Sequence, residues 1–140
     1  SALGAQLAAM CRSTGGALLV TPSRRTPPDA LRALCAALGD TPAAVWDGTS
    51  ENPYMGILAC ADAFVVTADS VNMVTEACYT GRPVMVADLP GGDRKFRAFH
   101  AGMQASGCTR PFRGALETWS YPPLDEMATI AAEVMRRIGQ

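Results

Sequence analysis

Short apolar runs alternate with amphipathic stretches along this chain, which is the pattern of alternating strands and helices. The predicted strands are residues 17–21, 43–46, 63–67, 84–87 and 109–112. Apolar residues three and four apart, together with helix start and stop signals, predict helices over residues 3–12, 27–38, 54–61, 71–80, 94–105 and 125–138. Because helices separate the strands, we predict an α/β fold, a Rossmann-like three-layer α/β/α domain with a parallel sheet of about five strands.

The most informative segment runs from residue 65 to residue 86. Its β-branched start predicts a strand, and Asp69 or Ser70 can cap the helix that follows. Gly81 ends that helix, Pro83 prevents its continuation, and the continuously apolar run 84–87 predicts a strand covered on both faces. The segment is therefore a βαβ unit with a helix N-terminus at the carboxyl end of a strand, where open α/β sheets bind anionic ligands.

Polar residues of this helix are candidates for binding a nucleotide. We assign Ser70, Asn72 and the Met73 backbone to a diphosphate or base, and Asp69 to capping, because a carboxylate repels phosphate. Glu76 is the only charge between Asp69 and Arg82, and a carboxylate can accept hydrogen bonds from two vicinal ribose hydroxyls. The alternative is an ordinary N-cap followed by a surface glutamate.

A second candidate loop follows the first predicted strand. Ser23, Arg24, Arg25 and Thr26 place two hydroxyls and two guanidiniums before a helix, a combination that suits phosphate. Thr26 is the expected N-cap, with Pro27 at the first helical position. The alternative is a solvated arginine pair on a surface loop.

A third candidate loop follows the fourth predicted strand. Gly92 allows close approach of a ligand to the backbone, Asp93 can hydrogen-bond hydroxyl groups, and Lys95 can pair with phosphate. The alternative is a mobile surface turn. We interpret the single histidine, His100, as a packing or surface residue, and Trp119 and Tyr121 as residues that pin the last helix rather than clamp a base.

Bulk properties narrow the class of protein. The 140 residues suffice for one domain, and a net charge of −1 argues against nucleic-acid binding. The five cysteines are widely spaced and lack a Cys-x-x-Cys pair, so we expect no metal site and reduced core thiols, as in a cytoplasmic protein. The chain does not begin with Met, and we expect a fragment of a two-domain protein.

The 65–86 segment resembles the carboxy-terminal half of GT-B glycosyltransferases, which carry a similar strand, Ser/Gly-rich turn, helix with Glu, Gly-x-Pro and strand. The chain is more similar still to a family related to the plant mitochondrial fission factor, whose bacterial members are often labelled nucleoside-diphosphate-sugar epimerases. The likeness extends to Ser23–Thr26, to Lys95 with Phe99, and to the motif from Trp119 to Asp125. The chain departs from that family where Asp125-Glu126 replaces Asn-Asp.

The resemblance implies a nucleotide-sugar (donor) binding domain of a metal-independent glycosyltransferase, with the turn backbone on the diphosphate and Glu76 on the ribose. The catalytic base would lie in the upstream amino-terminal domain, so the fragment should not turn over, and its catalytic residues are unknown. The expected ligand is a nucleoside-diphosphate sugar, bound as substrate without a cofactor. An epimerase of the GT-B fold and a non-enzymatic adaptor are the alternatives, and peripheral membrane association through the upstream half stays open.

Overall fold

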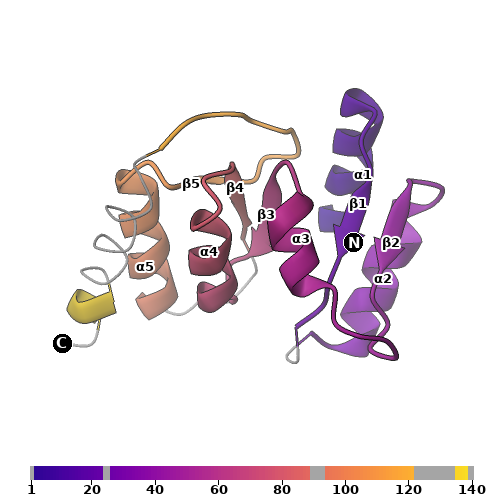
Figure 1. Cartoon of the computed structure of the whole chain (residues 1–140), viewed down its shortest axis with the longest axis horizontal. Helices are drawn as coiled ribbons and strands as arrows, with labels where there is room; N and C mark the ends of the chain where they lie inside the picture. Colours follow the sequence, from indigo (N-terminus) through magenta and orange to yellow (C-terminus); the bar gives the residue numbers. More distant parts are fainter. Residues whose placement is uncertain (1, 24–25, 89–93, 122–134, 139–140) are drawn as a thin grey trace. The chain divides into compact units, whose positions relative to one another are not determined.

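The computed structural model describes residues 2–23, 26–88, 94–121 and 135–138. The chain divides into two compact units, residues 1–60 with 113–116 and residues 61–112 with 117–140. Each unit contains parallel strands connected through helices, as labelled in Figure 1. The α/β class predicted from the sequence is confirmed.

Unit 1 contains a two-stranded parallel sheet in which Leu18 lies opposite Ala43 and Val20 opposite Val45. Its elements are α1 (Ala2–Thr14), β1 (Leu18–Val20), α2 (Pro28–Leu38), β2 (Ala43–Val45) and α3 (Tyr54–Cys60). The crossover from β1 to β2 passes through α2, which packs against α1.

Gly4 sets the close approach of α1 and α2. A Cβ atom at this position would lie 2.6 Å from the Ala37 Cβ and 2.9 Å from the Leu34 carbonyl oxygen. Real Cβ atoms do not come so close to backbone, so any larger residue would push the helices apart. Leu7, Ala8, Cys11 and Leu38 are buried in the same unit.

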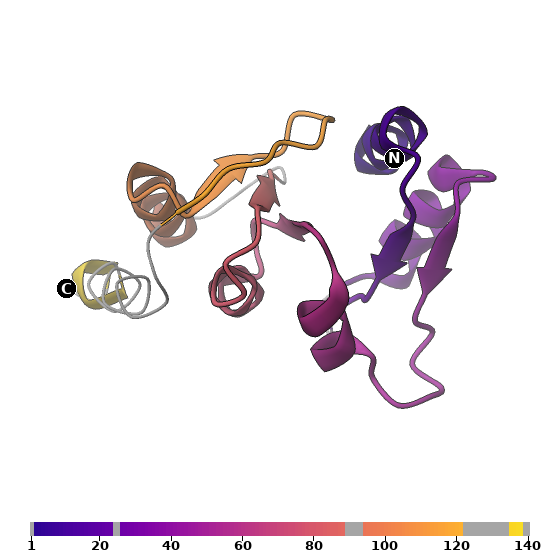
Figure 2. The same ribbon diagram turned by 45° about the horizontal axis from the view of Figure 1, so that its top comes forward.

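Unit 2 contains a three-stranded parallel sheet in the order β3-β4-β5. Its elements are β3 (Phe64–Thr67), α4 (Val71–Cys78), β4 (Val84–Ala87), α5 (Arg94–Ala105) and β5 (Thr109–Pro111). Helices α4 and α5 lie next to each other along this sheet in both views (Figures 1 and 2). All four residues of β4 are buried, as its continuously apolar sequence predicts.

The core of unit 2 comes from facing surfaces of the sheet and the two helices. Val74 and Cys78 of α4, Phe99 and Met103 of α5, and Met85 of β4 are each at most 1% exposed. The central strand β4 pairs with both β3 and β5, while α4 packs on β3 and β4 and α5 packs on β5.

Most predicted elements match the structure within two residues at each end. The single five-stranded sheet is the main difference, because the five strands of the described residues form sheets of two and three strands. In each unit the strands that pair are those joined by one helical crossover. Of the predicted last helix, residues 135–138 are helical and the rest lies outside the described residues.

Two smaller predictions were wrong. The N-cap of α2 is Pro27, and its first residue is Pro28, because the Thr26 hydroxyl is engaged in a preceding turn. The five cysteines are not uniformly core residues, since Cys35 and Cys60 are exposed while the other three are buried. Helix α2 buries only Leu38 fully, so its apolar stripe leaves Cys35 near the edge of the packed surface.

Candidate functional site

The turn between β3 and α4 presents backbone donors at the carboxyl end of a parallel strand. Ser70 is the N-cap residue, and its backbone N–H donates to the Thr67 carbonyl at 3.0 Å. The first hydrogen bond into the helix runs from the Val74 N–H to the Ser70 carbonyl at 3.0 Å. The N–H groups of residues 71–73 precede that bond and point beyond the helix start, where an anion is stabilised.

Ser70 and Asp69 have different roles from those of a simple N-cap. Ser70 is buried, and its side chain makes no capping hydrogen bond. Its hydroxyl lies 3.5 Å from Asp69 Oδ1, which also accepts a hydrogen bond from the Thr67 hydroxyl at 2.8 Å. The Asp69 carboxylate is thus held by Thr67, and the helix donors are not consumed by the Ser70 side chain.

The polar residues predicted on α4 share one side of the helix. Asn72 and Glu76 are exposed and four residues apart, which places them on the same face. At about 1.5 Å of rise per residue, Glu76 lies about 7.5 Å along the axis from Val71. Met73 is half-buried, while Val74 belongs to the buried face. One short helix therefore carries both the amide donors and the carboxylate.

The Ser23–Thr26 loop of unit 1 closes on itself. The Thr26 hydroxyl accepts the Ser23 N–H at 3.0 Å and lies 3.2 Å from the Ser23 hydroxyl, while the Thr26 N–H donates to the Ser23 carbonyl at 3.1 Å. Both hydroxyls predicted to bind phosphate are thus engaged with each other. Arg24 and Arg25 lie outside the described residues.

The third predicted loop is described only at its end. Lys95 lies exposed in the first turn of α5, next to Arg94. Gly92 and Asp93 lie outside the described residues. Two cations at a helix N-terminus oppose the helix dipole, and their positive charge favours a nearby anion.

A buried histidine supports the β3–α4 turn, a role that the sequence analysis missed. His100 is 8% exposed, and its Nε2 lies 2.6 Å from the Ala68 carbonyl oxygen. Ala68 follows β3 directly, and its N–H donates to the Ala87 carbonyl at 2.9 Å. The sequence signal was a polar ring within the apolar face formed by Phe96, Phe99 and Met103, a position that surface residues do not occupy.

Trp119 and Tyr121 attach a late segment to unit 2. The Trp119 indole N–H donates to the Gly107 carbonyl at 3.1 Å, and the Arg110 guanidinium stacks on its ring at 4.5 Å. The Tyr121 hydroxyl lies 3.1 Å from the Cys78 carbonyl and 2.6 Å from the Arg82 carbonyl. The Tyr121 hydroxyl thus lies at the C-terminal end of α4, and Trp119 lies against residues before and within β5. Most of the last helix, which both residues are predicted to pin, lies outside the described residues.

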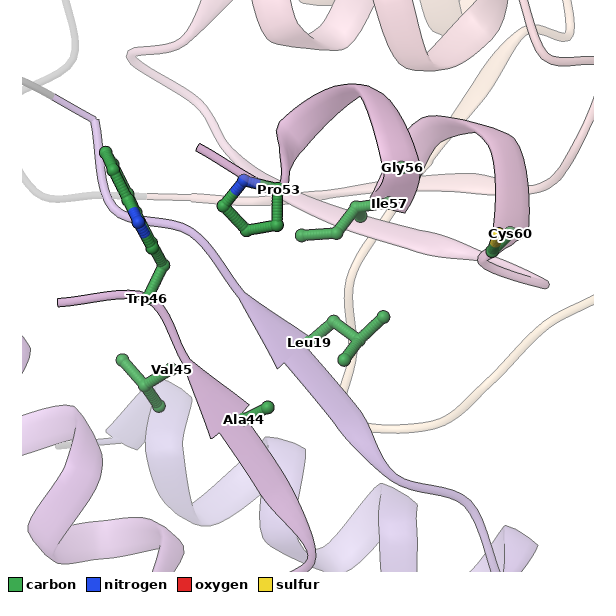
Figure 3. Close-up of a pocket in the computed structure, with 8 residues that line it drawn as sticks. All are labelled: Leu19, Ala44, Val45, Trp46, Pro53, Gly56, Ile57 and Cys60. Carbon is green, nitrogen blue, oxygen red and sulfur yellow. The ribbon is translucent and has the colours of Figure 1, made fainter. Parts of the chain in front are cut away.

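Figure 3 shows a cavity of about 400 Å³ in unit 1, between the β1–β2 sheet and α3. Its walls are Leu19, Ala44, Val45, Trp46, Pro53, Gly56, Ile57 and Cys60. The Trp46 indole N–H already donates to the Ser50 carbonyl at 3.2 Å. Binding sites orient their ligands with convergent polar groups, which this wall lacks, and none of the predicted site residues lines it.

The buried thiols are not poised for nucleophilic chemistry. Burial, with a smaller contribution from Cys108, raises the pKa of Cys78 to about 12. Burial also raises the pKa of Cys108, although the Ser106 hydroxyl acts in the opposite direction. Thiols of this kind are inert at neutral pH. In the described parts of the chain, no cluster of His, Cys, Asp and Glu is arranged to hold a metal ion.

The comparison with known proteins decides the family. The profile of the family described as "Mitochondrial fission ELM1" matches residues 1–138. The chain belongs to this family. An Arabidopsis thaliana member, named "Mitochondrial fission protein ELM1", is 42% identical over 131 residues, which cover 91% of this chain and 31% of the relative.

A second relative comes from Rickettsia prowazekii (strain Madrid E). It is named "Uncharacterized protein RP120" and is 33% identical over 89 residues, which cover 61% of this chain and 25% of the relative. The chain therefore spans about a third and a quarter of the length of these two relatives. No solved structure matches the chain. Among the described helices, none has both the length and the apolar character needed to cross a membrane.

Proposed function

We propose that unit 2 binds the nucleoside-diphosphate part of a nucleotide sugar at the turn between β3 and α4. The observation that carries this proposal is the combination of open amides at residues 71–73 with an exposed carboxylate at Glu76 on the same helix. The amides and the helix dipole attract the diphosphate, and the carboxylate accepts from the ribose hydroxyls. Ser70 and Asn72 supply polar contacts on either side of the first turn.

The reaction that we assign to the whole protein is glycosyl transfer by a metal-independent GT-B enzyme. A helix N-terminus can stabilise a departing nucleoside diphosphate without a metal, because its donors already point to where negative charge develops. This chain contributes donor binding, and the acceptor and the general base belong to the upstream domain. An epimerase of the same fold would use the same donor site, and it differs in the product formed.

A second candidate is a non-enzymatic adaptor in membrane fission. The observation that favours it is the name of the Arabidopsis relative, "Mitochondrial fission protein ELM1", which is 42% identical to this chain over 131 residues. An adaptor of this kind can retain the fold without retaining nucleotide affinity. Ligand binding therefore separates this candidate from both enzyme candidates.

Calorimetric titration with UDP, GDP, ADP and CDP tests the proposal. We expect weak binding of at least one nucleotide, because one domain supplies phosphate and ribose contacts without closure by a second domain. Absence of binding for all four at millimolar concentration would remove the site and leave the adaptor.

The ribose contact has its own test in the variant Glu76→Gln. The amide presents an NH₂ group where the carboxylate presents an acceptor, so it should weaken a ribonucleotide. A 2′,3′-dideoxy nucleotide has no hydroxyls to donate and should bind both proteins alike. Equal weakening of the two nucleotides would make Glu76 a structural residue.

A further inference from the structure

His100 connects α5 to the turn that precedes α4. Its Nε2 lies 2.6 Å from the Ala68 carbonyl oxygen, across 32 residues of sequence. A carbonyl oxygen only accepts, so Nε2 carries the hydrogen and donates it. The edge of one ring meets the face of the other in the Phe99–His100 pair, with centroids 5.3 Å apart.

The bond acts on a turn that is already held from the opposite side. The Ala68 N–H donates to the Ala87 carbonyl at the end of β4, and the Ser70 N–H donates to the Thr67 carbonyl. The His100 bond adds a third point, on the carbonyl side of Ala68. With these three hydrogen bonds the path of residues 67–70 is set, and so is the direction of the α4 amides that follow.

Burying the His100 imidazole costs free energy, and packing alone does not explain why a histidine occupies this position. His100 Nδ1 is buried without a hydrogen-bond partner among the described residues. A leucine would fill comparable space without burying an unpaired ring nitrogen, but it would leave the Ala68 carbonyl without this donor. The donor at Nε2 is what the histidine adds to the core, and its acceptor belongs to the candidate site.

We infer that His100 is a positioning residue for anion binding at the N-terminus of α4, acting through the Ala68 carbonyl. This inference rests on the proposed function and assigns that site a residue from α5. His100 does not contact the ligand. It holds Ala68 so that Ser70 and the amides of residues 71–73 face the diphosphate.

A matched pair of amide variants tests the inference. The His100→Gln side chain carries its NH₂ about as far as Nε2, whereas the His100→Asn side chain reaches only as far as Nδ1. We expect His100→Gln to keep wild-type affinity for the tightest binder among UDP, GDP, ADP and CDP. His100→Asn should weaken that nucleotide roughly three- to tenfold, the effect of losing one neutral hydrogen bond.

Controls separate positioning from general damage. Met103→Ala removes buried volume from the same helix and keeps the His100 donor, so it should lower the melting temperature and leave the affinity unchanged. His100→Leu serves as a second variant without the donor, and circular dichroism confirms folding at the assay temperature.

Each outcome has one meaning. Wild-type affinity in His100→Asn and His100→Leu would overturn the inference while the site stands. Equal losses in His100→Gln, His100→Asn and Met103→Ala would also overturn it, because they would show loss of stability alone. If wild type binds none of the four nucleotides, the proposed function fails first and the inference fails with it.

Discussion

The Ser23–Thr26 loop is closed by its own side chains, whereas the turn at Ala68–Ser70 is held by groups distant in sequence. In the first loop, the Thr26 hydroxyl accepts a hydrogen bond from the Ser23 N–H. In the second, β4 and α5 hold Ala68 from both sides, and none of the described residues accepts a hydrogen bond from the N–H groups of residues 71–73. Both loops follow a parallel strand and contain serine. The comparison distinguishes a turn that elements distant in sequence hold from a loop in which the Ser23 and Thr26 hydroxyls lie against each other.

The strands of the two units also differ, in how far their side chains are buried. Every residue of β4 is buried, and the strand lies between β3 and β5 with α4 packed against it. In β1, Leu19 is 54% exposed, and β2 has no buried residue. The rigid support for the candidate site therefore lies in unit 2.

The largest expected effect contrasts two apolar strand residues. Met85→Ala, at a fully buried position of β4, should cost about 2–5 kcal/mol of unfolding free energy through lost burial and the cavity that it leaves. Leu19→Ala, at a half-exposed position, should stay within about 0.5 kcal/mol. Urea denaturation of both variants measures the difference, and similar losses would contradict the contrast between the units.

Alkaline pH should destabilise unit 2 through its buried thiols. The folded pKa of Cys78 is raised from 9.0 to about 12, so the unfolded chain loses this proton first. The contribution of this thiol to the free energy of unfolding is therefore fully present below pH 9. As the pH rises toward 12, this contribution falls by about 1.4 kcal/mol per pH unit, or by about 4 kcal/mol in all. Cys78→Ala should reduce the slope of the unfolding free energy against pH by the equivalent of about one proton released on unfolding.

Val74→Ala is the matched control for the pH dependence. It removes buried methyl groups from the same helix without removing a titrating group. It should lower stability at every pH and keep the wild-type slope. Urea midpoints measured between pH 8 and 10 give the slope of stability against pH for each variant. If Cys78→Ala keeps the wild-type slope, this thiol ionises alike in the folded and unfolded states.

The arginines of the first loop test whether that loop binds phosphate. The sequence prediction for this loop expects Arg24→Ala and Arg25→Ala each to weaken a nucleoside diphosphate by about 1.5–3 kcal/mol, the scale of a hydrogen bond to a charged group, whereas a site in unit 2 alone expects unchanged affinity; stability should change little in either case. Isothermal titration measures both. Unchanged affinity in both variants would assign the phosphates to the β3–α4 turn without help from this loop.

Local sequence signals were sufficient to predict where the helices and strands lie. They also predicted which polar residues lie on the turn before α4 and on α4 itself. The apolar run at 84–87 and the glycine at 81, which has a φ of 76°, predicted β4 and the end of α4. Ser70, Asn72, Met73 and Glu76 lie on the predicted turn and helix. These features depend on neighbours within a few residues, which a sequence pattern contains.

Features that depend on distant partners could not be predicted. Nothing near His100 in the sequence points to Ala68, which lies 32 residues away. The Thr26 hydroxyl could have capped α2 or bonded to Ser23, and only the folded loop decides between them. The division of the five strands into two sheets likewise depends on which strands pair along their edges in the folded chain.

The variant Val71→Pro tests the central claim most directly, because it removes one backbone N–H at the start of α4. Proline is tolerated at the first position of a helix, so the fold should be preserved. Val71→Ala is the control, since it removes the side chain and keeps the N–H. Titration with the tightest-binding nucleoside diphosphate should show about a tenfold loss, about 1.5 kcal/mol, for Val71→Pro and none for Val71→Ala. Equal affinity of both variants and wild type would show that the amides of α4 do not hold the phosphates.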